Sequence, residues 1–172
     1  EFKNMIFTAY NYKSGPIAVR YPRGSAVLKK HIKYENIQIG SFEVLSDFGT
    51  DYLIIATGWT NLIAQKVCEK FNKENKKGVV INGRFIKPID GNTLKKYFKK
   101  ITKVITIEEN TIVGGFASAV MEWQALNGFN NKILPISIPD KYIEHGNYEE
   151  LRNLVGLNES TIYKKIKEFL IA

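Results

Sequence analysis

Short apolar runs alternate with longer amphipathic stretches over most of the chain. Four runs are almost wholly apolar and are bounded by turn residues, at residues 52–56, 79–81, 104–107 and 133–136. Such runs are typical of strands that are buried on both faces of a sheet. Another short strand is predicted at residues 42–46, and the turn at residues 47–51 joins it to the next strand. This arrangement suggests one antiparallel hairpin at the edge of the sheet.

Apolar residues also recur at the three- and four-residue spacing of helix faces. The three clearest faces consist of Leu62, Ile63, Val67 and Phe71; of Leu94, Tyr97, Phe98 and Ile101; and of Phe116, Ala119, Val120, Trp123 and Leu126. Further helices are predicted at residues 149–155 and after Asn158, a residue type that caps helix N-termini. Strands alternating with helices predict an α/β fold, a mostly parallel five-stranded sheet with helices on both faces and one antiparallel edge strand.

The N-terminal part does not share this alternation. Residues 1–12 have helical apolar spacing and are followed by Ser14-Gly15-Pro16, and a strand is expected at residues 17–21. We therefore expect three parts along the chain: residues 1–24 as the tail end of one domain, 25–40 as a linker and 41–172 as a second domain. Because the chain lacks an initiator Met, we expect it to begin inside a longer protein.

Composition narrows the class of protein. The net charge is +8, but only four of the 25 basic residues are Arg, and the Lys residues fall mainly on the outer faces of the predicted helices. Arg is the residue that best recognises phosphates and bases, so we expect no nucleic-acid binding. No apolar run approaches the ~20 residues that span a bilayer, so we expect no membrane association. A single cysteine, Cys68, excludes an internal disulfide and a multi-thiolate metal site.

Two glycine-containing turns lie between a predicted strand and a predicted helix. Gly114-Gly115 lacks both the G-x-G-x-x-G spacing and a P-loop lysine, so close packing at a tight turn is favoured over phosphate binding. The turn Thr57-Gly58-Trp59-Thr60 has the same interpretation. Neither turn predicts a cofactor site.

Acidic residues and histidines offer few catalytic candidates. Glu108 and Glu109 end a predicted strand, where side chains of adjacent residues point to opposite faces, so they do not form an acid/base pair. The hypotheses for them are a cap for the following helix or a subunit interface. We expect His31 in solvent and His145 in a structural or interface role, and further ligands for a metal site are not found.

The strongest candidate is the segment Arg20-Tyr21-Pro22-Arg23-Gly24. Two arginines lie three residues apart at the end of the strand expected at residues 17–21, where Pro22 fixes the backbone and Gly24 lets it turn. A guanidinium held in this way suits a bidentate bond to a phosphate or carboxylate. A structural ion pair is the alternative role for these side chains.

These residues also carry a resemblance. PIAVRYPRG is followed, in order, by YLIIATGWT, INGRFIKPID, TIEENTIVGGFASAVMEW and IPDKYIEHG. The ordered set resembles the C-terminal portion of the 1-deoxy-D-xylulose-5-phosphate synthase family, from the end of its pyrimidine-binding domain through its transketolase-like C-terminal domain. Two alternatives stay open: the equivalent domain of a transketolase or 2-oxo-acid dehydrogenase, and a stand-alone binding domain with a basic surface.

The resemblance implies a thiamine-diphosphate enzyme of the transketolase group, located in the bacterial cytoplasm or a plastid-type organelle. The whole enzyme would join pyruvate to glyceraldehyde 3-phosphate, releasing CO2 and forming 1-deoxy-D-xylulose 5-phosphate. Thiamine diphosphate and Mg²⁺ would be bound by other domains of the same polypeptide. The resemblance assigns Arg23 to the substrate phosphate and leaves Arg20 as a candidate supporting residue, with no catalytic, cofactor or metal residue in this chain. It also implies a homodimer, and a chain that is inactive by itself.

Overall fold

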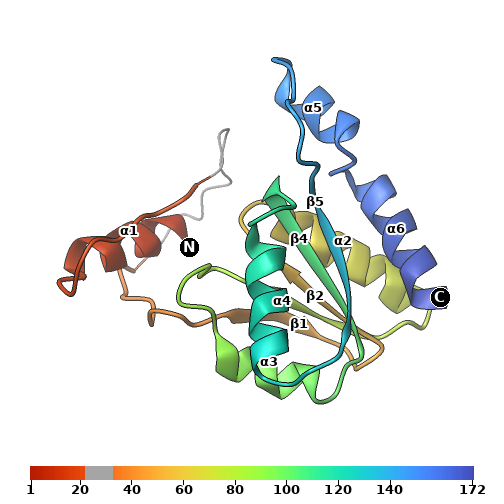
Figure 1. Ribbon diagram of the computed structural model, residues 1–172, viewed down its shortest axis with the longest axis horizontal. Helices are drawn as coiled ribbons and strands as arrows, with labels where there is room; N and C mark the ends of the chain where they lie inside the picture. Colours follow the sequence, from red (N-terminus) through yellow and green to blue (C-terminus); the bar gives the residue numbers. More distant parts are fainter. Residues whose placement is uncertain (22–32) are drawn as a thin grey trace.

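The computed structural model describes residues 1–21 and 33–172. Helices and strands alternate from β2 to β5, as the sequence predicts (Figure 1). The strands are β1 (Glu43–Asp47), β2 (Tyr52–Ala56), β3 (Gly78–Asn82), β4 (Lys103–Thr111) and β5 (Lys132–Ile138). The helices are α1 (Phe2–Asn11), α2 (Thr60–Lys73), α3 (Gly91–Phe98), α4 (Phe116–Leu126), α5 (Tyr148–Leu154) and α6 (Glu159–Ile171).

The five strands form one sheet in the order β1-β3-β2-β4-β5. β2 is the central strand; it pairs in parallel with β3 on one side and β4 on the other, and β4 pairs in parallel with β5. β1 lies antiparallel to β3 at one edge. The predicted fold class, a mostly parallel sheet with one antiparallel edge strand, is therefore confirmed.

The predicted hairpin between the first two strands is wrong. β1 pairs with β3 rather than with β2, its neighbour in the sequence. All five residues of β2 are buried, and both of its hydrogen-bonding edges are taken by parallel strands. β1 is largely exposed, so it fits only an outer edge, and β3 provides one.

Each face of the sheet supports its own apolar core, because side chains alternate along the strands. In β2, Tyr52, Ile54 and Ala56 belong to one core and Leu53 and Ile55 to the other. The first core is completed by residues of α2 and α6, and the second by residues of α3 and α4. Helices thus cover both faces, as predicted. The polar groups at the ends of the strands are not covered by these cores.

Helix faces differ from the prediction at two positions. Leu62 on α2 is 60% exposed and Leu126 at the end of α4 is 86% exposed, although both were expected on an apolar face. On α2 the buried face instead runs through small and polar residues, namely Thr60, Asn61, Ala64 and Cys68, together with Val67 and Phe71. Small side chains let the helix lie close to the sheet, and this rotates Leu62 outward.

The N-terminal helix lies beside the sheet domain rather than within its layers (Figure 1). It ends at Asn11, as its sequence predicts, but the strand expected at residues 17–21 does not form. The helix packs on the incoming chain through Thr8, whose hydroxyl accepts a hydrogen bond from Ile37 N–H at 2.8 Å. It reaches the sheet through Glu1, which accepts a hydrogen bond from Asn82 Nδ2 at 2.8 Å.

Candidate functional site

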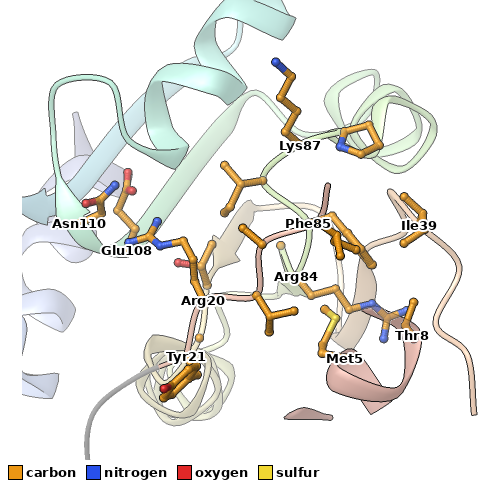
Figure 2. Close-up of a pocket in the computed structure, with 18 of the residues that line it drawn as sticks. Met5, Thr8, Arg20, Tyr21, Ile39, Arg84, Phe85, Lys87, Glu108 and Asn110 are labelled. Carbon is orange, nitrogen blue, oxygen red and sulfur yellow. The ribbon is translucent and has the colours of Figure 1, made fainter. Parts of the chain in front are cut away.

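A cleft of about 470 Å³ opens outside the carboxyl ends of the central strands (Figure 2). From β2 the chain crosses to β3 on one side of the sheet, whereas β4 leads to β5 on the other, so the strand order reverses between β2 and β4. Ligands of open α/β sheets bind at this type of switch point. The cleft is therefore the candidate functional site of the chain.

Two distant parts of the sequence form its walls. One wall is the segment Pro16–Tyr21, which contains most of the PIAVRYPRG motif. The other consists of the residues that follow or end three neighbouring strands, namely Thr57–Trp59 after β2, Gly83–Pro88 after β3, and Glu108–Asn110 in β4. Met5, Thr8, Tyr12 and Ile39 complete the lining. Four of the five sequence motifs that carry the family resemblance thus contribute residues to one cleft, and IPDKYIEHG does not.

Glu108 is the buried charge at the base of the cleft, with 2% of its surface exposed. Its carboxylate accepts hydrogen bonds from Phe116 N–H at 2.7 Å and Ala117 N–H at 2.8 Å, the free donors at the N-terminus of α4. The helix dipole also favours an anion at this end. The hypothesis that one of the paired glutamates caps the following helix is confirmed for Glu108.

Gly115 packs closely against this cap. A Cβ atom there would lie 2.5 Å from Glu108 Oε2 and 2.3 Å from the carbonyl oxygen of Thr111. The favoured interpretation of Gly114-Gly115, close packing at a tight turn, is confirmed. A phosphate could not bind these N–H groups at the N-terminus of α4, because the Glu108 carboxylate already accepts their hydrogen bonds.

Glu109 points to the other side of β4 and binds a cation held between two aromatic rings. It accepts hydrogen bonds from Trp59 Nε1 and the Tyr148 hydroxyl, and it lies 3.7 Å from Arg152 Nε. The Arg152 guanidinium carbon is 3.4 Å from the centre of the Trp59 ring and 3.7 Å from that of Tyr148. The pKa of Tyr148 is raised mainly by burial of its hydroxyl and, to a smaller extent, by the hydrogen bond to Glu109.

This cluster fastens α5 to the sheet. No residue of α5 is buried, so the helix has no apolar anchor of its own. Tyr148 and Arg152 lie one turn apart on it, and both contact the Trp59–Glu109 pair. Stacking of a guanidinium on aromatic rings adds to the attraction of the carboxylate. The cluster therefore has a structural role at the rim of the cleft.

Arg84 closes the other end of the cleft with an internal network. Its guanidinium donates to the Ser41 carbonyl at 3.0 Å and lies 3.5 Å from Glu43 and 3.7 Å from Glu1. Asn82, which is buried, donates hydrogen bonds to the same two carboxylates. The charge of Arg84 is therefore balanced within the chain.

Arg20, the candidate supporting residue, extends from the N-terminal segment toward Glu108 and Asn110 (Figure 2). Within the described residues it makes neither a hydrogen bond nor an ion pair with another side chain, so the structural ion pair considered from the sequence is not found for it there. Arg23 and His31 lie outside the described residues. His145 is exposed in the loop between β5 and α5.

Cys68 is a packed core residue, as expected. It is fully buried on α2, and its sulfur accepts a hydrogen bond from the Tyr52 hydroxyl at 3.3 Å. Burial raises the pKa of its thiol. In residues 1–21 and 33–172, no group of three or more His, Cys, Asp or Glu side chains is placed to hold a metal ion. None of the helices in these two ranges is long and apolar enough to cross a membrane.

Sequence reasoning missed the residues that link separate parts of the chain. Trp59 and Arg152 were not singled out as partners of Glu109, because the contacts join positions far apart in the sequence. The local signal is limited to the polar pair Tyr148 and Arg152, which are four residues apart at helical spacing. Arg84 lies in the INGRFIKPID motif, which identified the family without indicating a contact.

The fold and the motifs define a domain class. Residues 40–162 match the family model of the transketolase C-terminal domain, so the chain belongs to this family. Over 98% of its length it is 40% identical to the 1-deoxy-D-xylulose-5-phosphate synthase of Carboxydothermus hydrogenoformans, and over 99% it is 37% identical to that of Aquifex aeolicus. The resemblance predicted from the motifs is thus confirmed. The chain spans 27% of the length of both synthases.

Solved structures agree on the fold. A split-gene transketolase in the form of an "inactive beta4 tetramer", where beta4 refers to that protein and not to strand β4, superposes with a TM-score of 0.75 at 23% identity. The superposition covers 86% of this chain and 48% of that one. A transketolase from Campylobacter jejuni superposes with a TM-score of 0.57 at 13% identity, covering 75% of this chain and 18% of that one. At these identities the likeness concerns the arrangement of the strands and helices alone.

Proposed function

We propose that this chain is the C-terminal portion of a 1-deoxy-D-xylulose-5-phosphate synthase. The observation that carries the proposal is the alignment with the synthase of Carboxydothermus hydrogenoformans, 40% identical over 168 residues. That alignment covers 98% of the chain, so it takes in the arginine segment as well as the sheet domain. The intact enzyme would condense pyruvate with glyceraldehyde 3-phosphate, releasing CO2 and forming 1-deoxy-D-xylulose 5-phosphate.

Thiamine diphosphate would supply the carbanion chemistry of this reaction, with Mg²⁺ as its partner. The chain's own charged groups at the cleft do not fit a metal-bound diphosphate. Glu108 is bonded to the N-terminus of α4, and Glu109 to Trp59, Tyr148 and Arg152. We therefore assign no residue of this chain to the cofactor or to Mg²⁺, which other domains of the same polypeptide would hold.

The proposed contribution of the chain to substrate binding is the arginine segment. Arg23 would bind the phosphate of the aldehyde substrate, with Arg20 in a supporting role. A guanidinium suits this task because it presents paired donors to phosphate oxygens and stays charged.

In the full-length synthase, Arg23→Ala should raise KM for glyceraldehyde 3-phosphate at least about tenfold, which corresponds to the loss of a charged hydrogen bond. KM for pyruvate should change little, because pyruvate carries no phosphate. Steady-state assays with pyruvate, glyceraldehyde 3-phosphate, thiamine diphosphate and Mg²⁺ measure both values. The present chain, assayed beside the parent, should show no turnover.

Three outcomes of this assay would count against the proposal. An inactive wild-type parent would redirect the assignment to transketolases or 2-oxo-acid dehydrogenases. Turnover by the present chain alone would mean that the active site lies within it. Equal rises in KM for both substrates would assign Arg23 to the structure of the enzyme rather than to the phosphate.

We also propose that residues 41–172 form an independent domain that supports a homodimer. The two apolar cores contain only residues from Phe42 onward, which supports the boundary. Two-fold homodimers are the commonest soluble oligomers. Residues 41–172 alone should melt cooperatively and elute as a dimer in size-exclusion chromatography with light scattering. A non-cooperative melt would contradict the boundary, and a monomer at high concentration would contradict the dimer.

A further inference from the structure

Residues Pro16–Tyr21, which include Arg20, and the carboxyl end of β4 form opposite walls of one cleft. We propose that Asn110, with the carboxylate of Glu108 beside it, positions Arg20 and thereby the arginine segment of the synthase. This inference rests on the proposed function, and it gives the C-terminal domain a part in substrate affinity. Asn110 and Glu108 would be positioning residues, because they act through Arg20 and not on the substrate.

The first argument is that both partners are available. Figure 2 shows the Arg20 side chain extending across the cleft toward Glu108 and Asn110. Among residues 1–21 and 33–172, neither the Arg20 guanidinium nor the Asn110 amide has a hydrogen-bond partner. The amide oxygen of Asn110 is a good acceptor for a guanidinium N–H, and Asn110 is only partly exposed. A donor and an acceptor without partners thus face one cleft from opposite walls.

The second argument is the charge that remains once the internal pairs are counted. Glu109 is bonded to Trp59, Tyr148 and Arg152, and Arg84 lies beside Glu1 and Glu43. Within the described residues, the carboxylate of Glu108 accepts hydrogen bonds from the backbone N–H groups of α4 alone, and no Lys or Arg side chain there pairs with it, although it lines the cleft. Of the two other basic residues in the lining, Arg84 is paired as described and Lys87 extends away from Glu108 (Figure 2). Arg20 is therefore the cation best placed to respond to the Glu108 charge.

The consequence for substrate binding follows from chain length. Arg23 comes three residues after Arg20, and three residues span at most about 11 Å when fully extended. Fixing Arg20 at the end of β4 therefore limits the volume that Arg23 can explore. Restricting a binding group in this way lowers the entropy that is lost when the substrate binds.

The test compares Asn110→Ala with Asn130→Ala in the full-length synthase. Asn130 is an exposed residue in the loop before β5, at the opposite end of the sheet, so it controls for the loss of an amide. Asn110→Ala should raise KM for glyceraldehyde 3-phosphate about three- to tenfold, the effect of one hydrogen bond. KM for pyruvate and kcat should stay within about twofold of wild type, as should all values for Asn130→Ala. In Arg20→Ala enzyme, adding Asn110→Ala should change KM little further.

A second measurement does not depend on activity. Arg20 is exposed, as is Lys13 in the same segment, so trypsin can reach both, and a contact of Arg20 with Asn110 and Glu108 would slow the cut after Arg20 alone. Lys13 therefore serves as an internal reference. In the 172-residue chain, Asn110→Ala should raise cleavage after Arg20, relative to Lys13, about threefold or more, because less of the segment is held in place. Asn130→Ala should leave the ratio unchanged.

The outcomes separate the two proposals. If the parent synthase is inactive but the cleavage ratio rises, the positioning of Arg20 stands and the proposed function fails. If the parent is active but Asn110→Ala changes neither the aldehyde KM nor the cleavage ratio, the positioning inference is wrong. A rise in KM for both substrates together with a lower melting temperature would assign Asn110 to stability, and this result would also overturn the inference.

Discussion

Replacing Glu108 with Ala should lower the free energy of unfolding by about 2–4 kcal/mol, because the change leaves two buried helix donors without an acceptor. The carboxylate accepts from Phe116 N–H and Ala117 N–H, and only 2% of the residue is exposed. Water cannot readily replace the lost acceptor in so closely packed a place. Urea denaturation of the 172-residue chain, followed by circular dichroism, measures the effect.

Two variants make this test specific. Glu108→Gln keeps one acceptor oxygen but directs its NH2 group at the other helix donor, so the loss should be smaller than for Ala and still clear. Glu122→Ala removes a carboxylate from the exposed side of the same helix and should change the free energy of unfolding by less than about 0.5 kcal/mol. Equal effects of Glu108→Ala and Glu122→Ala would show that the cap contributes nothing.

Gly78→Ala should destabilise the sheet by about 2–3 kcal/mol, since the new methyl group meets a buried aromatic ring. A Cβ atom at Gly78 would lie 2.3 Å from two carbons of the Tyr52 ring. Tyr52 is fully buried and stacks edge-on against Phe71 at a centroid distance of 5.6 Å, so it cannot move aside. Thermal or urea unfolding measures the loss.

The cause is tested by giving the methyl group space. Tyr52→Val destabilises the chain by itself because it leaves a cavity. The loss of unfolding free energy in the double variant Gly78→Ala with Tyr52→Val should nevertheless be smaller, by at least about 1 kcal/mol, than the sum of the losses in the two single variants. Gly146→Ala is the control, because its nearest neighbour is the flexible end of Leu151 at 3.1 Å. Strict additivity in the double variant would mean that the Tyr52 contact is not the reason for the loss.

Local patterns predicted most of the elements, and the physical reason is burial. The run Tyr52–Ala56 is apolar throughout because β2 has both faces and both edges covered, so the sequence shows a central strand directly. Asn158 was expected to cap the last helix, and its side chain does accept a hydrogen bond from Thr161 N–H. These features depend on neighbours a few positions away.

The errors arose where packing between distant parts decides the outcome. Nothing in its own sequence shows that β1 pairs with β3, because the partner depends on which edges β2 leaves free. Leu62 satisfies the helical spacing of its neighbours, yet the sheet selects the face with Ala64 and Cys68. In the site, the cap by Glu108 was among the hypotheses because it acts within one strand–turn–helix unit. The contact of Arg152 with Trp59 joins separate units, and no local pattern indicates it.

The strand order also restricts how the sheet can assemble. In the described sheet, every pair of hydrogen-bonded strands is separated in the sequence by at least one helix. For example, α2 lies between β2 and β3, and α4 lies between β4 and β5. No tight turn can therefore bring two strands together first, and each pairing requires closing a loop that contains a whole helix. Folds of this kind form more slowly than those built from local contacts. β1, although first in the sequence among the strands, has no partner until β3 has formed.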